Sequence, residues 1–168
     1  MPNKKTILTK EVAAAKLQRM ALEVAERLSG DEEPLIIIGI KNHGIVIAEK
    51  IATLLKPYAN FPVQMISLSM DKQTPKEIIL NDKINLSDKN ILLIDDVCNT
   101  GKTLLYALKP LLQFYPKRIQ TLVLVERMHK LFPIKPDYTG LSVATTLSDF
   151  IHVEVSNNDI TAVITAGD

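Results

Sequence analysis

The sequence predicts an α/β fold in which a central, mostly parallel sheet is flanked by helices and followed by a small C-terminal cap. Two observations predict it. First, apolar runs of strand length, such as LIIIGI (35–40) and NILLIDDV (90–97), are typical of strands buried on both faces. Second, segments with helical spacing of apolar residues separate these runs, so we expect helical crossovers between parallel strands. The length of 168 residues fits one domain, 1–168, with a single core.

The first predicted element is an amphipathic helix between Thr9, as its N-cap, and Gly30, as its stop. The strand 35–40 follows a polar break. The chain then turns through KNHG into a helix of about a dozen residues that ends at Pro57. VQMISLS (63–69) predicts the next strand, so the order of strand, glycine turn and helix begins to repeat.

The second half continues this alternation. We expect a strand at 90–97, a helix from about Gly101 to Tyr115 that stops at Pro116, and a strand at 118–125. Parallel strands with helical connections are therefore predicted up to this point.

Two regions stay outside the alternation. Residues 70–89 offer only the short apolar group 78–80 and predict a flexible lid loop over a binding site. Residues 126–168 contain prolines and short strand-like pieces at 141–144 and 151–155, and they predict the cap over the edge of the sheet.

Composition excludes several classes of partner. With 20 basic and 19 acidic side chains the net charge is +1, so no overall field attracts nucleic acid or anionic lipid. The single cysteine, Cys98, cannot form an internal disulfide. The N-terminus lacks the apolar run of a secretory signal, and no stretch approaches the roughly 18 apolar residues that span a bilayer. We expect a cytoplasmic protein with no membrane partner.

The segment ILLIDDVCNTGKTL (91–104) carries the clearest chemistry. Its strand delivers Asp95 and Asp96 to a polar turn, 99–103, that opens a helix. A Walker-type loop is excluded because that motif needs glycine where Asp96 stands. The free amides and dipole of a helix N-terminus favour a phosphate, and the carboxylates suit ribose hydroxyls or a divalent metal. The implied ligand is a sugar phosphate; the alternative is that the aspartates only cap the helix and Thr103 is ordinary surface.

A second anion site is expected in GIKNHG (39–44), at the end of another strand. Lys41 can neutralise the charge of a diphosphate, and Gly44 lets the backbone approach closely. Taken alone, these residues are equally consistent with a simple turn.

IDDVCNTGKT resembles the signature of the type I phosphoribosyltransferases. The resemblance implies transfer of the ribose phosphate of phosphoribosyl diphosphate to a nucleobase, with Mg²⁺ as cofactor. It implies that Asp95 and Asp96 are catalytic, binding the ribose hydroxyls and, through ligand or water, the metal, and that catalytic Lys41 stabilises the leaving diphosphate. It also implies a non-proline cis peptide at Ile40–Lys41 or its neighbour. The other residues that it assigns to substrate binding are Asn42, His43, Gly44, Cys98, Asn99, Thr100, Gly101, Lys102 and Thr103.

In the same family the lid closes to exclude water. Lys72 and Lys76 are then candidates to reach the diphosphate.

Nearly the whole chain resembles the family of bifunctional pyrimidine operon attenuators and uracil phosphoribosyltransferases, through GIKNHGIVIAEKI, IDDVCNTGKTL and IQTLVLVERMHKLFPIKPDYTG. The resemblance implies uracil as acceptor. The alternative acceptor is a 6-oxopurine, but enzymes for that base carry an aspartate where this chain has Asn99, which cannot act as a base. The base pocket implied by the last segment contains Val125, Arg127, Pro136, Asp137 and Tyr138.

Three departures from that family affect the hypothesis. The lid has Ser69-Met70-Asp71 in place of a tyrosine-arginine-aspartate cluster, and His43 replaces an arginine. At the face where relatives bind RNA, Leu22 replaces a histidine. A second hypothesis is therefore a binding protein, either an RNA attenuator or a nucleotide sensor without catalysis. RNA binding requires one continuous basic face from Arg19, Arg27, His129 and Lys130.

We also expect a homodimer or a higher homo-oligomer, although the aliphatic helix faces are equally compatible with core packing.

Overall fold

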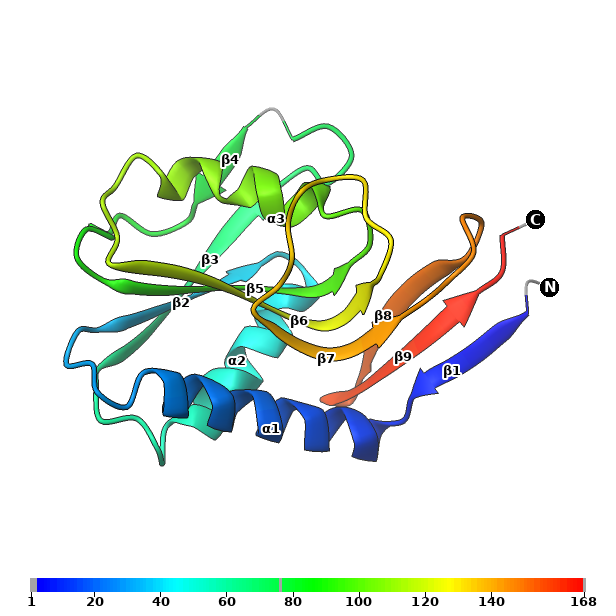
Figure 1. The fold of residues 1–168 in the computed structure, drawn as a ribbon, viewed down its shortest axis with the longest axis horizontal. Helices are drawn as coiled ribbons and strands as arrows, with labels where there is room; N and C mark the ends of the chain where they lie inside the picture. The colour runs from blue at the N-terminus through cyan, green and yellow to red at the C-terminus, as the bar shows by residue number, and fades with distance from the viewer. Residues whose placement is uncertain (1–2, 76, 168) are drawn as a thin grey trace.

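The computed structural model describes residues 3–75 and 77–167 (Figure 1). Its larger sheet has the strand order β4-β3-β2-β5-β6-β7. All neighbours in it are parallel except the edge strand β4, which runs antiparallel to β3. This confirms the predicted α/β fold with a mostly parallel sheet. The strands are β2 (Leu35–Ile40), β3 (Val63–Met70), β4 (Ile78–Leu80), β5 (Asn90–Cys98), β6 (Arg118–Arg127) and β7 (Tyr138–Val143).

Helices cover both faces of this sheet (Figure 1). On one face lie α1 (Lys10–Arg27) and α2 (His43–Leu55); on the other lie the short α3 (Lys102–Ala107) and a 3-10 turn, η1 (Lys109–Leu111). All six residues of β2 are buried because its side chains alternate between two apolar clusters. The continuous apolar run therefore does indicate a strand covered on both sides.

A second sheet is built from both ends of the chain. It has the order β1-β9-β8, from β1 (Lys4–Leu8), β9 (Asp159–Thr165) and β8 (Phe150–Ser156), all antiparallel. Asn157 and Asn158 join β8 to β9 with left-handed φ values of 48° and 68°, which asparagine tolerates better than most residues. This sheet is the cap, and Figure 1 shows β1 and β9, the first and last strands of the chain, side by side in it.

Three sequence predictions need correction. The helix predicted over 101–115 ends at Ala107, because Pro110 lacks the N–H group that would continue it and supports only a 3-10 turn. The strand-like piece at 141–144 belongs to β7, which pairs with β6 in the main sheet and not in the cap. The N-terminal strand β1 was not predicted, and it completes the cap through pairing with β9.

The lid segment is also more ordered than a loop, since its apolar group forms β4. Asn81 fixes this strand to β3: its side-chain amide donates to the hydroxyl oxygens of Ser67 and Ser69, at 2.8 and 3.0 Å. Within the described residues, none of the helices combines the length and hydropathy needed to cross a membrane.

Candidate functional site

The carboxyl ends of β2, β3 and β5 meet at one edge of the main sheet, where two adjoining hollows open. The first has a volume of about 590 Å³ and lies between the loop after β2 and the lid. The second, of about 350 Å³, lies between the turn after β5 and the cap strand β8. Three side chains line both hollows: His43, Lys72 and Asp96. Asp96 of the predicted acidic pair therefore stands at their junction, with Asp95 buried directly beside it, as expected for a ligand site in an open α/β sheet.

Asp95 and Asp96 face the lid and the loop after β2, not the apolar interior. Asp95 is fully buried; its carboxylate accepts the Asp96 N–H at 2.9 Å, and the Lys72 ammonium lies 3.1 and 3.3 Å from its two oxygens. Asp96 lies 3.7 Å from the same ammonium and 3.4 Å from Nδ1 of His43. The two carboxylates thus share one cation from the lid.

The electrostatics of this group depend on its burial. Burial raises the pKa of Asp95, and the adjacent charge of Asp96 raises it further. Burial by itself lowers the pKa of Lys72, but the attraction of both carboxylates outweighs it, so the pKa of Lys72 lies above its ordinary value. These shifts conflict, because a protonated Asp95 would remove that attraction. The contacts of the ammonium with both Asp95 oxygens favour the ionised pair.

The turn after β5 has the form of an anion cradle. Gly101 adopts a φ of 85°, a left-handed conformation that glycine alone takes without cost, and α3 begins directly after it. The Thr100 hydroxyl accepts the Lys102 N–H at 3.2 Å, while the Thr100 carbonyl is held by the N–H groups of the 131–132 loop at 3.0 Å. Within residues 3–75 and 77–167, the N–H groups of Thr100 and Thr103 meet no protein acceptor. They remain available to a phosphate.

The loop after β2 supplies the other half of the predicted site. Lys41, Asn42 and His43 line the larger hollow, and the cis peptide expected in this loop is Lys41–Asn42. Gly44 lies elsewhere than predicted: it is buried, and a Cβ on it would stand 2.8 Å from the Ile94 carbonyl oxygen. Its α-carbon therefore packs closely against β5, and this sets the start of α2 against the acidic pair.

The lid is fastened over this edge by polar contacts. The Asp71 carboxylate accepts hydrogen bonds from the N–H groups of Gln73 and Thr74 and from the Thr74 hydroxyl, which folds 71–74 into a tight turn. Hydrogen bonds from Gln73 hold the pKa of Asp71 below its ordinary value. Lys102 of the phosphate turn donates to the Gln73 carbonyl at 3.0 Å. Lys76, the second lysine predicted to reach the diphosphate, lies outside the described residues.

Sequence reasoning missed the residues that close the smaller hollow opposite the turn. They are Ile151, His152 and Val153 of β8. The alternating IHVEV pattern did predict a strand there, but only the pairing of β8 with β9, which pairs in turn with β1, brings that strand over the site. His152 is exposed, and its Nε2 lies 3.2 Å from the Thr165 hydroxyl.

None of the residues predicted for the base pocket around Tyr138 lines either hollow at the acidic pair. Tyr138 pairs with Leu122, which pairs with Ile94, so Tyr138 stands one residue before the level of Asp95 and two strands away from it. Tyr138 is buried, with its hydroxyl donating to Gln120 Oε1 at 2.9 Å and the Arg27 guanidinium 4.6 Å from the ring centroid.

The other members of that predicted group have structural contacts too. The Val125 side chain is part of the core, and Pro136 is buried. Arg127 donates to the Asp149 carbonyl, and Asp137 accepts the Thr121 N–H at 2.8 Å.

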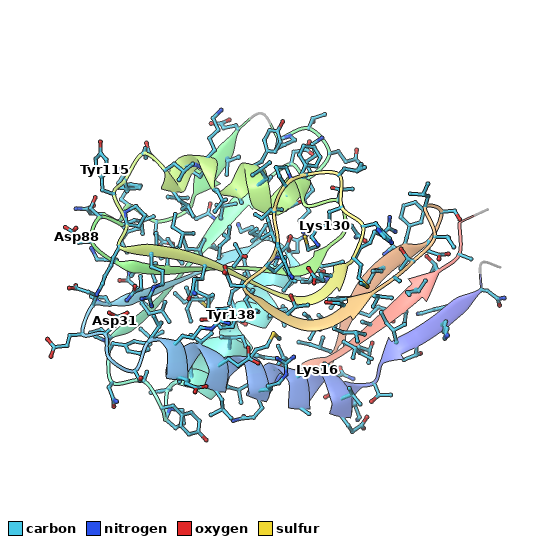
Figure 2. The ribbon with its side chains drawn as sticks, viewed as in Figure 1. Lys16, Asp31, Asp88, Tyr115, Lys130 and Tyr138 are labelled. Atoms are coloured by element: carbon cyan, nitrogen blue, oxygen red, sulfur yellow. The ribbon has the colours of Figure 1, made fainter. Side chains whose placement is uncertain are left out.

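Three of the four residues proposed for RNA binding, all but His129, are engaged within the chain. Arg19 contacts Glu23 at 2.6 Å and the carbonyls of 139–140. Lys130 pairs with the buried Glu126 at 3.0 Å, and Arg27 covers Tyr138. Figure 2 shows Lys130 on the loop after β6, apart from Tyr138 at the start of β7. These contacts give no support to one continuous basic face.

The acidic pair also fits a magnesium ion that is held in part by its substrate. Within the described residues, no three His, Cys, Asp or Glu side chains converge as a metal site. Mg²⁺ commonly binds through one or two carboxylates and completes its shell with water and substrate phosphates. Asp95 and Asp96 supply that donor set.

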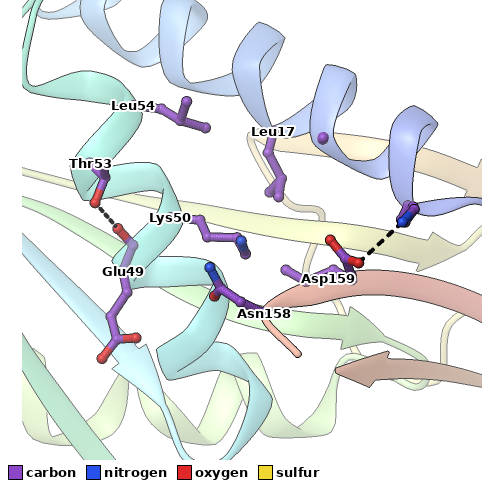
Figure 3. A pocket seen from close by; sticks show the side chains of 10 residues that line it. Leu17, Glu49, Lys50, Thr53, Leu54, Asn158 and Asp159 are labelled. Carbon is purple, nitrogen blue, oxygen red and sulfur yellow. Dashed lines mark hydrogen bonds and ion pairs between the residues drawn. The ribbon is translucent and has the colours of Figure 1, made fainter. Parts of the chain in front are cut away.

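A third hollow, of about 420 Å³, lies between α1, α2 and the start of β9 (Figure 3). Its polar groups are partly paired: Lys10 contacts Asp159 at 3.4 Å, and the Thr53 hydroxyl donates to the Glu49 carbonyl at 2.9 Å. It shares no lining residue with the two hollows at the acidic pair.

Comparison with known proteins agrees with this geometry. The phosphoribosyl transferase domain matches residues 4–159. The chain is 35% identical to the bifunctional protein PyrR of Clostridium novyi, over 92% of this chain and 93% of that protein. It is 32% identical to PyrR of Brevibacillus brevis, over 98% and 97%. The hypoxanthine phosphoribosyltransferase of Trypanosoma cruzi has the same fold, with a TM-score of 0.81 at 17% identity over 98% of this chain and 97% of that one. The chain therefore belongs to the phosphoribosyltransferase family.

Proposed function

We propose that this protein transfers the ribose phosphate of phosphoribosyl diphosphate to uracil, releasing diphosphate. The observation that carries the proposal is the pairing of two carboxylates with a turn whose Thr100 and Thr103 amides have no acceptor among the described residues. Hydroxyls and a phosphate on one sugar satisfy both groups at once. A ligand that carried only anionic groups would leave the two carboxylates without a partner.

The reaction breaks the bond between the anomeric carbon and the diphosphate oxygen, which keeps the electron pair, and forms a bond from that carbon to a base nitrogen. That nitrogen loses its proton, which the released diphosphate or water takes up. Lys41 stabilises the charge that develops on the leaving diphosphate, and the 99–103 turn holds the 5-phosphate. Asp95 and Asp96 orient the sugar through its hydroxyls. Bound Mg²⁺ supplies further neutralisation of the diphosphate charge. The lid excludes water, which would otherwise attack the anomeric carbon.

The acceptor base fits in the smaller hollow, between the turn and β8. Ile151 and Val153 offer it apolar surface, and His152 offers a ring nitrogen. Uracil is supported by the end-to-end similarity to proteins named PyrR, together with Asn99 in the turn. The likeness to the hypoxanthine enzyme, at 17% identity, bears on the fold alone and does not select a 6-oxopurine as the acceptor.

A base panel tests the proposal. The purified protein with Mg²⁺ and phosphoribosyl diphosphate is given uracil, hypoxanthine, guanine, adenine or orotate, and diphosphate release is measured. We expect release with uracil only. Release with hypoxanthine or guanine selects the purine alternative, and silence across all five favours a nucleotide sensor.

The Asn99→Asp variant sharpens the choice of base. An aspartate there can take up a purine proton. If the wild type uses uracil, this variant should lose uracil activity and gain a detectable rate with hypoxanthine. Sedimentation of the same preparations tests the homodimer that we include in the proposal.

A further inference from the structure

Lys72 occupies the point where the two hollows of the site join. Its ammonium contacts both oxygens of Asp95 and lies 3.7 Å from Asp96. It belongs to the lining of the larger hollow and of the smaller one. A single ligand that spans both hollows, with its sugar hydroxyls at the carboxylates, therefore meets Lys72 in its path.

The position of Lys72 is set by the lid and not by the rigid sheet. The Asp71 turn shapes the backbone around it, and the Lys102 contact with the Gln73 carbonyl ties that backbone to the phosphate turn. The Lys72 side chain is 40% exposed, whereas that of Asp95 is fully buried. The cation can thus leave toward solvent while the carboxylate cannot.

The larger hollow offers Lys72 a second anionic partner once substrate is present. Lys41 and His43 line this hollow, and Met70 stands there where an arginine would add positive charge. A diphosphate held here needs more cations than these side chains supply. Lys72 is within the same lining and carries a long, flexible stem.

We propose that Lys72 is an exchangeable counter-ion of the acidic pair. In the ligand-free protein its ammonium neutralises Asp95 and Asp96. When phosphoribosyl diphosphate and magnesium bind, the sugar hydroxyls and the metal take over the carboxylates, and the ammonium moves to the diphosphate. The movement of Lys72 to the diphosphate rests on the proposed function. Its contact with the acidic pair concerns the ligand-free protein alone.

The exchange predicts opposite effects of one substitution on two ligands. Lys72→Met keeps the length and apolar stem of the side chain but removes its charge. Without the competing ammonium, Mn²⁺ alone should bind the acidic pair about fivefold more tightly than in the wild type. Phosphoribosyl diphosphate at saturating Mg²⁺ should bind about tenfold more weakly, because a charged partner of the diphosphate is lost.

Electron paramagnetic resonance of free Mn²⁺ measures the first affinity, and titration calorimetry measures the second. Lys72→Arg should keep both affinities close to the wild type. Lys83→Met changes an exposed lysine of the lid that lines neither hollow, so it is the matched control and should change neither affinity. If Lys72 instead forms a permanent structural ion pair, Lys72→Met should weaken the binding of both Mn²⁺ and phosphoribosyl diphosphate or of neither. Either result overturns the proposal.

A measurement on the wild type covers the case in which Lys72→Met does not fold. Acetic anhydride labels lysines, and peptide mass spectrometry compares Lys72 with Lys83. Labelling of Lys72 should speed up relative to Lys83 as Mn²⁺ is added, because the metal releases the ammonium. An unchanged ratio overturns the exchange. Failure of the wild type to bind phosphoribosyl diphosphate would instead count against the proposed function.

Discussion

The two walls of the smaller hollow are built in different ways. The motif wall, residues 95–103, comes from one uninterrupted stretch in which a strand, a turn and a helix start follow each other. The cap wall, residues 151–153, belongs to a strand that depends on β9 and, through it, on β1 at the other end of the chain. Local sequence thus encodes the sugar-phosphate side, whereas pairing between distant segments creates the side proposed for the base.

This contrast predicts that damage to the motif wall affects catalysis itself, while damage to the cap wall affects the base alone. The strongest test is Asp96→Asn. It removes a carboxylate charge from the acidic pair without changing size, and kcat should fall by at least about 100-fold. Steady-state diphosphate release measures this, and circular dichroism checks the fold. Asp88→Asn, at an exposed carboxylate beside the opposite end of β5 (Figure 2), is the control and should keep the wild-type rate.

The packing of α2 against β5, next to the motif wall, can be disrupted at Gly44. A Cβ at Gly44 would lie 2.8 Å from the Ile94 carbonyl, so Gly44→Ala must push α2 away from β5. We expect unfolding in urea to show a loss of about 1–3 kcal/mol. Gly30→Ala offers a matched comparison, since nothing lies within 4 Å of a Cβ there, and it should stay within about 0.5 kcal/mol of the wild type. Equal losses in the two variants would contradict this account of Gly44.

The cap wall should respond with a smaller and more selective change. His152→Ala removes a side chain that lines the smaller hollow, and KM for the base should rise about three- to tenfold while KM for phosphoribosyl diphosphate stays constant. Initial-rate kinetics with each substrate varied in turn give both values. Glu154→Ala, two residues along the same strand and outside the hollow, serves as control. A rise in both KM values would mean that the cap wall contacts phosphoribosyl diphosphate as well as the base.

The smallest expected effect concerns Cys98, inside the motif wall. Burial raises the pKa of its thiol to about 11, since the thiolate is the charged form that burial disfavours. Iodoacetamide should therefore modify the native protein very slowly between about pH 7 and 8 and quickly after unfolding. Mass spectrometry follows the adduct, and rapid native labelling would count against a buried, unactivated thiol.

Sequence was most informative where neighbouring residues decide the outcome. The apolar runs of β2 and β5, the Thr9 cap of α1 and the turn from Asn99 to Thr103 were all found from local pattern alone. The hydroxyl of Thr9 does accept the Val12 N–H, at 3.3 Å. Each of these features depends on contacts within one element or on burial of a whole run.

The missed features depend on long-range pairing or on competing side chains. β1 is a short polar strand, KKTIL, whose partner lies about 160 residues away in the register Lys4 to Thr165. The base-pocket residues around Tyr138 were taken from a family resemblance, and they line neither of the two hollows at the acidic pair. The contact of Lys72 with the acidic pair follows from the folded lid, which residue type alone does not specify.

The pairing of β1 with β9 has a practical consequence for engineering this protein. Residues near the two chain ends, such as Lys4 and Thr165, are direct neighbours in the cap. A short peptide could link them, and new ends could be opened in an exposed turn, to give a circularly permuted protein. An affinity tag attached before β1 or after β9 would also be joined to the sheet that carries His152, so tagged preparations should be compared with cleaved ones before acceptor kinetics are interpreted.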